Sequence, residues 1–164
     1  MSSNCAYRLF CAVILLTSTV IAALACFGNV TDPGSNMLFV SHIFSMDTTY
    51  KAPALMWRAI TAPAMHWAGF GVIVAIEATI TVLGALGLYK IWQNRCADEE
   101  TFDAIKWYGY AAFALCIFVW GFIFQAAGGE WFASWQSEHW NGLRDATRIT
   151  MLALCGAMAL RLAK

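Results

Sequence analysis

Charged residues are scarce in this sequence, and the charges that it has cancel. Lys, Arg, Asp and Glu make up 12% of the 164 residues, against about 25% in soluble proteins, and ten basic residues balance ten acidic ones. Without a positive excess the chain lacks the charge that attracts nucleic acid, so we expect no nucleic-acid partner. Hydrophobic residues make up 60%, against about 45–50% in soluble proteins, which indicates a membrane protein.

Catalytic motifs are absent as well. The chain has no phosphate-binding loop pattern, no H-E-x-x-H and no G-x-S-x-G, so phosphate-loop, metalloprotease and hydrolase functions have no support. Its six cysteines show no C-x-x-C spacing, and four lie in apolar runs while two flank such runs singly: Cys11, Cys26, Cys116 and Cys155, then Cys5 and Cys96. We therefore expect packed thiols rather than a disulfide framework.

Four stretches are long enough to cross a hydrocarbon core, which needs about 20 apolar residues. They are residues 9–27, 62–91, 104–127 and 143–162. Because backbone groups in lipid must bond internally, each span is a helix. We expect one all-α membrane domain, residues 1–164, with four transmembrane helices and short interfacial helices in its two outer connections. A cleaved signal peptide is an alternative for the first span, although the length of its apolar run favours an uncleaved helix.

The basic residues predict the orientation of these spans. Six of them lie with the termini and the inner connection and four on the other side: Arg8, Lys90, Arg95, Lys106, Arg161 and Lys164, against Lys51, Arg58, Arg144 and Arg148. The positive-inside rule then places both termini in the cytoplasm. Seven of the eight tryptophans lie near span ends, as in the aromatic belts of membrane interfaces, and only Trp120 lies deep within a span.

Both outer connections carry structure-forming patterns. In the first, Asp32 and Pro33 form a helix opening, and residues 37–46 are amphipathic, which predicts a short helix on the membrane surface. In the second, residues 128–142, two glycines are expected to end the third span. At 100° per residue, four side chains of this connection fall in one arc: Trp131, Phe132, Trp135 and His139. This pattern favours a tryptophan-anchored interfacial helix or, alternatively, a lid over a ligand entrance.

Three segments carry a resemblance to a known family. They are FVSHIFSMDT (residues 39–48), WRAI (57–60) and GEWFASWQS (129–137). With them the chain resembles an uncharacterised family of predicted small bacterial integral-membrane proteins with four spans, over nearly its whole length. The resemblance implies a multi-pass protein of the bacterial inner membrane and implies no activity.

Glu77 is the most informative single residue. It follows His66 by 11 residues, so it lies about 16 Å deeper on the same helix face, near the middle of a core about 30 Å thick. A charged carboxylate there costs about 2.5–3.5 kcal/mol, so we expect it to pair or to take up a proton. The expected partners are Arg148, Gln125 and the hydroxyls of Thr79 and Thr81.

The remaining polar residues extend this site toward the outer side. Arg148 either forms a structural pair with Asp145 or Glu130 or holds an anionic or carbonyl headgroup. His42, His66 and His139 all map to the outer side, where haem b would need one ligand from a loop and where no spacing supports a zinc or copper site. The candidate ligand- or partner-binding residues are His66, Glu77, Gln125, Glu130, Trp131, Trp135, His139 and Arg148.

Three functions fit these features. The first is a non-catalytic accessory subunit of a larger respiratory or photosynthetic complex, because small residues in the spans allow close helix approach: Gly84, Gly87, Gly109, Gly121 and Gly156. The second is an electron-transfer subunit that binds quinone or haem. The third is an oligomeric transporter or channel that uses Glu77. The expected partners are the lipid bilayer and other membrane subunits.

Overall fold

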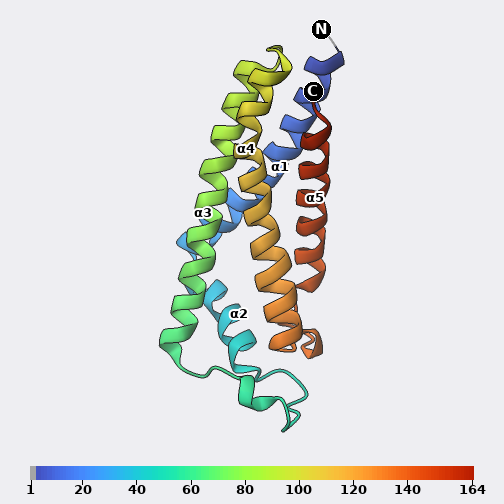
Figure 1. Ribbon diagram of the computed structural model, residues 1–164. Helices are drawn as coiled ribbons and strands as arrows, with labels where there is room; N and C mark the ends of the chain where they lie inside the picture. The colour runs from blue at the N-terminus through green and yellow to red at the C-terminus, as the bar shows by residue number, and fades with distance from the viewer. Residues whose placement is uncertain (1–2) are drawn as a thin grey trace.

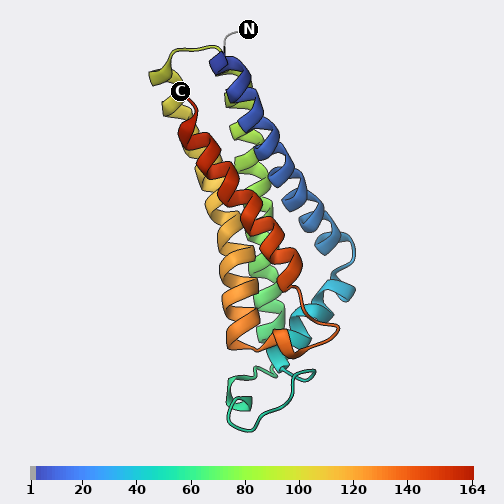
Figure 2. The ribbon, with the colours of Figure 1, turned by 90° about the vertical axis from the view of Figure 1, so that its right-hand side faces the viewer.

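The computed structural model describes residues 3–164, and its long helices lie side by side in one elongated bundle (Figures 1 and 2). The long segments are α1 (Ser3–Thr31), α3 (Pro63–Asn94), α4 (Glu99–Cys116) continued by η2 (Ile117–Trp131), and α5 (Leu143–Leu162). The short segments are α2 (Pro33–Ser45), η1 (Met56–Arg58) and η3 (Ser134–Gln136). Residues 3–164 contain no strand, so the all-helical class is confirmed.

Three helices are long and apolar enough to cross a membrane: Ser3–Thr31, Pro63–Asn94 and Glu99–Trp131. They cover the first three predicted spans, apart from Ala62, and extend beyond them, since the 32 residues of α3 measure about 48 Å. Helix α5, with 20 residues and a length of about 30 Å, covers the fourth predicted span. The charges in its first turns lower its hydropathy, and its passage through the membrane stays a prediction.

Both termini lie at the same end of the bundle, here called the terminal end, and the opposite end is called the loop end (Figure 1). Glycines let the long helices approach closely. A Cβ atom at Gly84 of α3 would stand 2.1 Å from Oγ1 of Thr19 on α1, and one at Gly156 of α5 would stand 2.4 Å from the Phe113 ring on α4. These small residues therefore serve contacts within the chain.

Helix α4 changes to π-type hydrogen bonding at Ile117 and continues to Trp131. The amide of Phe132 donates to the carbonyl of Ala127, five residues back, at 3.0 Å. The prediction that Gly128 and Gly129 end the third span is therefore wrong. Both glycines lie inside the helix. Gly129 has no side chain, and a leucine of α5 packs in the space where that side chain would be. Such π segments are rare and often occur at functional sites.

The first span and α2 form one broken helical path. The Asp32 carboxylate accepts a hydrogen bond from the backbone N–H of Ser35 at 3.2 Å, and Pro33 is the first residue of α2, as predicted. Three apolar residues of the predicted segment, Met37, Val40 and Ile43, are buried on one face, while its position at the membrane surface stays a prediction. That face packs into the bundle against α3 and η2, and α2 runs obliquely toward the loop end (Figures 1 and 2).

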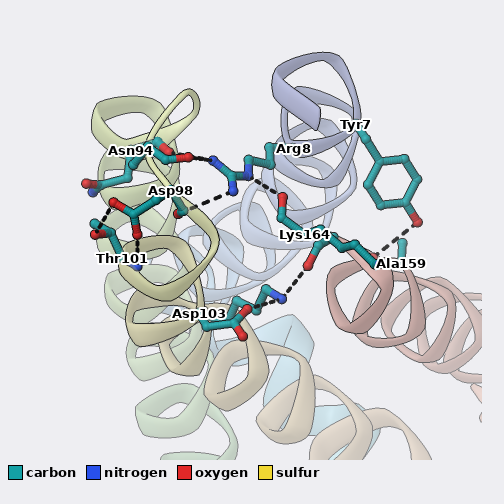
Figure 3. Close-up of polar contacts among 11 residues, drawn as sticks. Tyr7, Arg8, Asn94, Asp98, Thr101, Asp103, Ala159 and Lys164 are labelled. Atoms are coloured by element: carbon teal, nitrogen blue, oxygen red, sulfur yellow. Dashed lines mark hydrogen bonds and ion pairs between the residues drawn. The ribbon is translucent and has the colours of Figure 1, made fainter. Parts of the chain in front are cut away.

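Arg8 joins three helices at the terminal end (Figure 3). Its side chain is 2% exposed and lies 4.1 Å from the centre of the Phe102 ring. The guanidinium donates to backbone carbonyls at the end of α3, in the α3–α4 turn and after α5: Asn94, Arg95, Ala97, Asp98 and Lys164, at 2.7–3.5 Å. The last carbonyls of a helix lack partners within it and attract cations, so Arg8 satisfies the end of α3.

Two further links hold the same end. Lys106, which is 7% exposed, pairs with Asp103 at 2.5 Å and donates to the carbonyl of Ala163 beyond α5. A disulfide joins Cys5 to Cys96, whose Cα atoms are 5.2 Å apart. The prediction of packed thiols is therefore wrong for these two cysteines. Their sequence separation of 91 residues hid the pair.

Candidate ligand-binding cavity

Glu77 lies on the buried face of α3. Its side chain is 3% exposed and that of His66 is 5% exposed, so the two share one buried face as predicted. The exposed Trp67 and Trp92 mark the two ends of α3, and Glu77 lies 10 and 15 residues from them, or about 15 and 22 Å along the helix. The carboxylate therefore belongs to the apolar middle of the bundle.

The carboxylate has a partner that the sequence did not indicate. Nδ2 of Asn29, near the end of α1, donates to Oε2 of Glu77 at 2.8 Å. Among the described residues, no side chain donates a hydrogen bond to the other oxygen, Oε1. Asn29 lies just after the first predicted span, at a position where an asparagine is common simply because a helix ends. Its contact with Glu77 is therefore visible only in the fold.

The expected partners of Glu77 lie elsewhere. Arg148 is 74% exposed and pairs with Asp145 at 3.4 Å. Gln125 faces α5, where it donates to Oγ1 of Thr150 at 3.0 Å, because the π register turns it toward that helix. The hydroxyl of Thr81 donates to the backbone carbonyl of Glu77 and not to its carboxylate. The predicted pairings of Glu77 are therefore wrong.

A cavity of about 420 Å³ opens beside Glu77, between α1, α2, α3, η2 and the start of α5. Its polar wall consists of Asn29, Asn36, Glu77 and Asp145. Its aromatic wall consists of Phe39, Phe70, Trp120 and Phe124. Among the described residues that line it, none is a Lys, Arg or His. The cavity thus combines carboxylates and aromatic faces without a positive charge.

The break between α1 and α2 forms part of this cavity. Nδ2 of Asn36 donates to the carbonyls of Gly28 and Asp32, at 3.3 and 3.0 Å, so this side chain joins the end of α1 to the start of α2. Because Asn29 reaches Glu77, the break lies near the level of the middle of α3. Non-helical backbone at such a level is tolerated where it lines a cavity, and broken helices supply binding sites in many transporters.

The predicted loop-end cluster is not formed. Nε2 of His66 lies 2.7 Å from the carbonyl of Ile60, while Arg148 lies on α5. Trp131 packs edge-on against Trp57 under the guanidinium of Arg58. Three further candidates are exposed: Glu130, Trp135 and His139. These residues serve separate contacts.

The connection of residues 128–142 is not the helix that was predicted. After η2 only the single turn η3 is helical, and Ala133 adopts a left-handed backbone conformation with φ 52°. Thr48 of the other connection donates to the Ser137 hydroxyl at 2.9 Å, and the Tyr50 amide donates to Gln136 at 3.0 Å. The two connections at the loop end therefore hold each other.

The histidines are not arranged as a metal or haem site. His42 contacts Asp47 at 2.9 Å and stacks on Trp140, whereas His66 contacts the Ile60 carbonyl. Among the described residues no three His, Cys, Asp or Glu side chains are grouped to hold a metal ion. Haem held between two facing histidines does not fit the contacts of His42 and His66.

These features define a small helical membrane protein with a polar cavity beside a buried carboxylate. The chain belongs to the DUF2165 family of predicted small integral membrane proteins, whose family model matches residues 7–163. The match covers nearly the whole chain and confirms the resemblance. The protein is therefore in contact with the lipid bilayer. No curated protein and no solved structure matches this chain.

Proposed function

We propose that this protein binds a small organic cation, an amine on an apolar body, in the cavity beside Glu77. The observation that carries this proposal is a carboxylate only 3% exposed, which receives a single hydrogen bond, from the Asn29 amide, among the described residues. One neutral amide offsets only part of the cost of a buried carboxylate, about 2.5–3.5 kcal/mol in a membrane. A ligand ammonium would supply the missing charge.

The walls of the cavity support the same ligand class. Phe70, Trp120 and Phe124 offer ring faces, which attract cations electrostatically, and most strongly where water is excluded. Asp145 also lines the cavity, but its carboxylate is exposed and pairs with Arg148 at 3.4 Å. An anionic ligand would meet the Glu77 carboxylate and no basic side chain among the described lining residues. An ammonium would meet complementary groups on every polar wall.

Quinone binding has weaker support. A quinone presents carbonyl oxygens and needs hydrogen-bond donors. The amides of Asn29 and Asn36 already donate to Glu77 and to backbone carbonyls. Haem binding is not proposed, because the histidines do not pair.

Transport is a second candidate, supported by the broken path of α1 and α2 at the cavity. A proton would satisfy Glu77 while the cavity is empty, and exchange of that proton for an organic cation would couple their movements. The accessory-subunit hypothesis used the glycines of the spans as contact sites for a partner subunit. Gly84 and Gly156 pack against other helices of the same chain, so they no longer support it. Purification in mild detergent with identification of companion proteins tests that hypothesis directly.

Binding is tested with benzyltrimethylammonium, whose charge does not titrate, by calorimetry on the detergent-purified protein. We expect Glu77→Gln to raise the Kd about thirtyfold or more, because removal of one charge from a buried charge pair costs about 2–5 kcal/mol. Glu130→Gln removes an exposed carboxylate outside the cavity and should leave the Kd unchanged. Absence of binding to the wild type, or an equal Kd for Glu77→Gln, would refute the proposal.

We also propose that the protein lies in the bacterial inner membrane with four spans and both termini in the cytoplasm. The six basic residues of the terminal end support this orientation. The Cys5–Cys96 disulfide lies at that same end, whereas the cytoplasm keeps most thiols reduced, so the redox state of this pair in the cell is a test of the orientation. A C-terminal reporter that is active only in the periplasm, together with a persistent Cys5–Cys96 disulfide, would reverse the orientation.

A further inference from the structure

A second, apolar cavity lies next to the one beside Glu77. It has a volume of about 140 Å³ and lies between α2, α3, η2 and the connection that follows η2. Among the described residues that line it, Ser134 is the only one with a polar side chain. We call this space the apolar chamber.

The two cavities share a wall. Five residues line both of them: Phe39, Val40, Ile73, Phe124 and Gly142. Ile73 lies one helical turn from Glu77 on the same face of α3, a distance of about 6 Å along the axis. A molecule with its charge at Glu77 therefore needs only a short linker to reach the chamber.

The size of the chamber selects its occupant. An enclosed apolar cavity of about 150 Å³ binds one benzene molecule, so the apolar chamber, which is half-open and has a volume of about 140 Å³, has room for a single six-membered ring. Rings already surround the space, since Phe39 stacks on Phe124 with centroids 5.8 Å apart and Phe44 stacks on Phe132 at 5.0 Å. An additional ring can join such pairs with offset or edge-on geometry.

We infer that the ligand is an arylalkylamine, with its ammonium at Glu77 and a single aromatic ring in the apolar chamber. This inference rests on the proposed function. That proposal places the ammonium group of the ligand at Glu77, and the inference places its apolar part. It adds two properties that the cavity beside Glu77 does not determine. The ligand carries one ring rather than two fused rings, and a short alkyl chain separates the ring from the ammonium.

The test compares three probes by calorimetry on the purified protein: propylammonium, 3-phenylpropylammonium and 3-(2-naphthyl)propylammonium. We expect the phenyl probe to bind the wild type about tenfold to hundredfold more tightly than propylammonium, because it buries a whole ring. We expect the naphthyl probe to lose most of that gain, since its second ring exceeds the chamber.

Two variants alter the chamber without touching the cavity beside Glu77, because Ala127 and Ile43 line only the chamber. Ala127→Leu should abolish the preference for phenyl, and Ile43→Ala should move the preference to naphthyl. Ala126→Leu is the matched control, because the side chain of Ala126 is exposed and lies outside both cavities. Competition by benzene against the phenyl probe, but not against propylammonium, gives a second reading on the wild-type protein.

The outcomes separate the inference from the proposed function. If amines bind through Glu77 and the phenyl group adds nothing, the chamber assignment is wrong while the proposed function stands. Equal loss of phenyl preference in Ala127→Leu and Ala126→Leu would also overturn it. If none of the three amines binds, both proposals fall.

Discussion

Arg8 is the single side chain on which the terminal end depends most. It is 2% exposed and donates hydrogen bonds to five backbone carbonyls, those of residues 94, 95, 97, 98 and 164. Replacement by methionine keeps the apolar part of the side chain and removes every one of these hydrogen bonds. Among the described residues, the carbonyls of Arg95 and Ala97 then lose their hydrogen-bond donor, which costs about 1–3 kcal/mol for each where water cannot reach.

We expect Arg8→Met to lower the free energy of unfolding by about 3–5 kcal/mol, the usual cost of removing one partner from a buried charged contact. Arg8→Lys keeps the positive charge at the helix end but loses the planar fork that spans several carbonyls, so it should lose about 1–3 kcal/mol. Arg144 is exposed, and Arg144→Met should stay within about 0.5 kcal/mol of the wild type.

The assay is reversible unfolding in mild detergent, followed by circular dichroism and by labelling of Cys11. This thiol lies close to Arg8 in α1, is 2% exposed, and its reaction with a maleimide reports opening of that end. An Arg8→Met variant as stable as Arg144→Met, with Cys11 still protected, would refute the reasoning. The guanidinium would then contribute little to stability, and other contacts would hold the three helices together.

Two further predictions concern packing and pH. Gly84→Ala should cost about 1–3 kcal/mol, because its Cβ atom would stand 2.1 Å from Oγ1 of Thr19, whereas Gly71→Ala, with open space around it, should be neutral or slightly stabilising in the same unfolding assay. Hydrogen bonds from the backbone N–H and hydroxyl of Thr101 hold the pKa of Asp98 below its ordinary 3.8, so its contribution to stability is present above pH 3.8 and is lost as the pH falls further. Below that pH the Tm of the wild type should therefore fall more steeply than the Tm of Asp98→Asn. Parallel plots of Tm against pH for the two proteins would contradict this role.

Local patterns predicted most of the helices. Asp32 and Pro33 opened α2 as expected, because a carboxylate cap followed by proline satisfies the first turn of a helix without help from elsewhere. The shared face of His66 and Glu77 was predictable for the same reason, since the period of one helix relates both positions. Predictions from local sequence were wrong where a contact with a distant part of the chain outweighed the local preference. The two glycines at residues 128 and 129 predicted a helix end, but the helix continues through them, and a leucine of α5 fills the space beside Gly129.

The polar site depended on neighbours that no local pattern identifies. Asn29 lies 48 residues before Glu77, and the residues that were expected to pair with Glu77 face other helices or the surface. The π register of η2 turned Gln125 toward α5, because five-residue hydrogen bonding shifts every later side chain relative to an α-helix. The two cavities likewise exist only where α2 leans against η2.

The sequence by itself determined the class of protein, the approximate extent of its apolar helices, and the positions where charge is costly. These properties follow from the transfer of side chains into lipid and from the period of one helix, which neighbouring residues alone set. Only the tertiary structure decided that Asn29 meets Glu77, that Arg8 closes the terminal end, and that a chamber for one ring adjoins the buried carboxylate. Those facts depend on which helix lies opposite which, and that is settled by the packing of the whole chain.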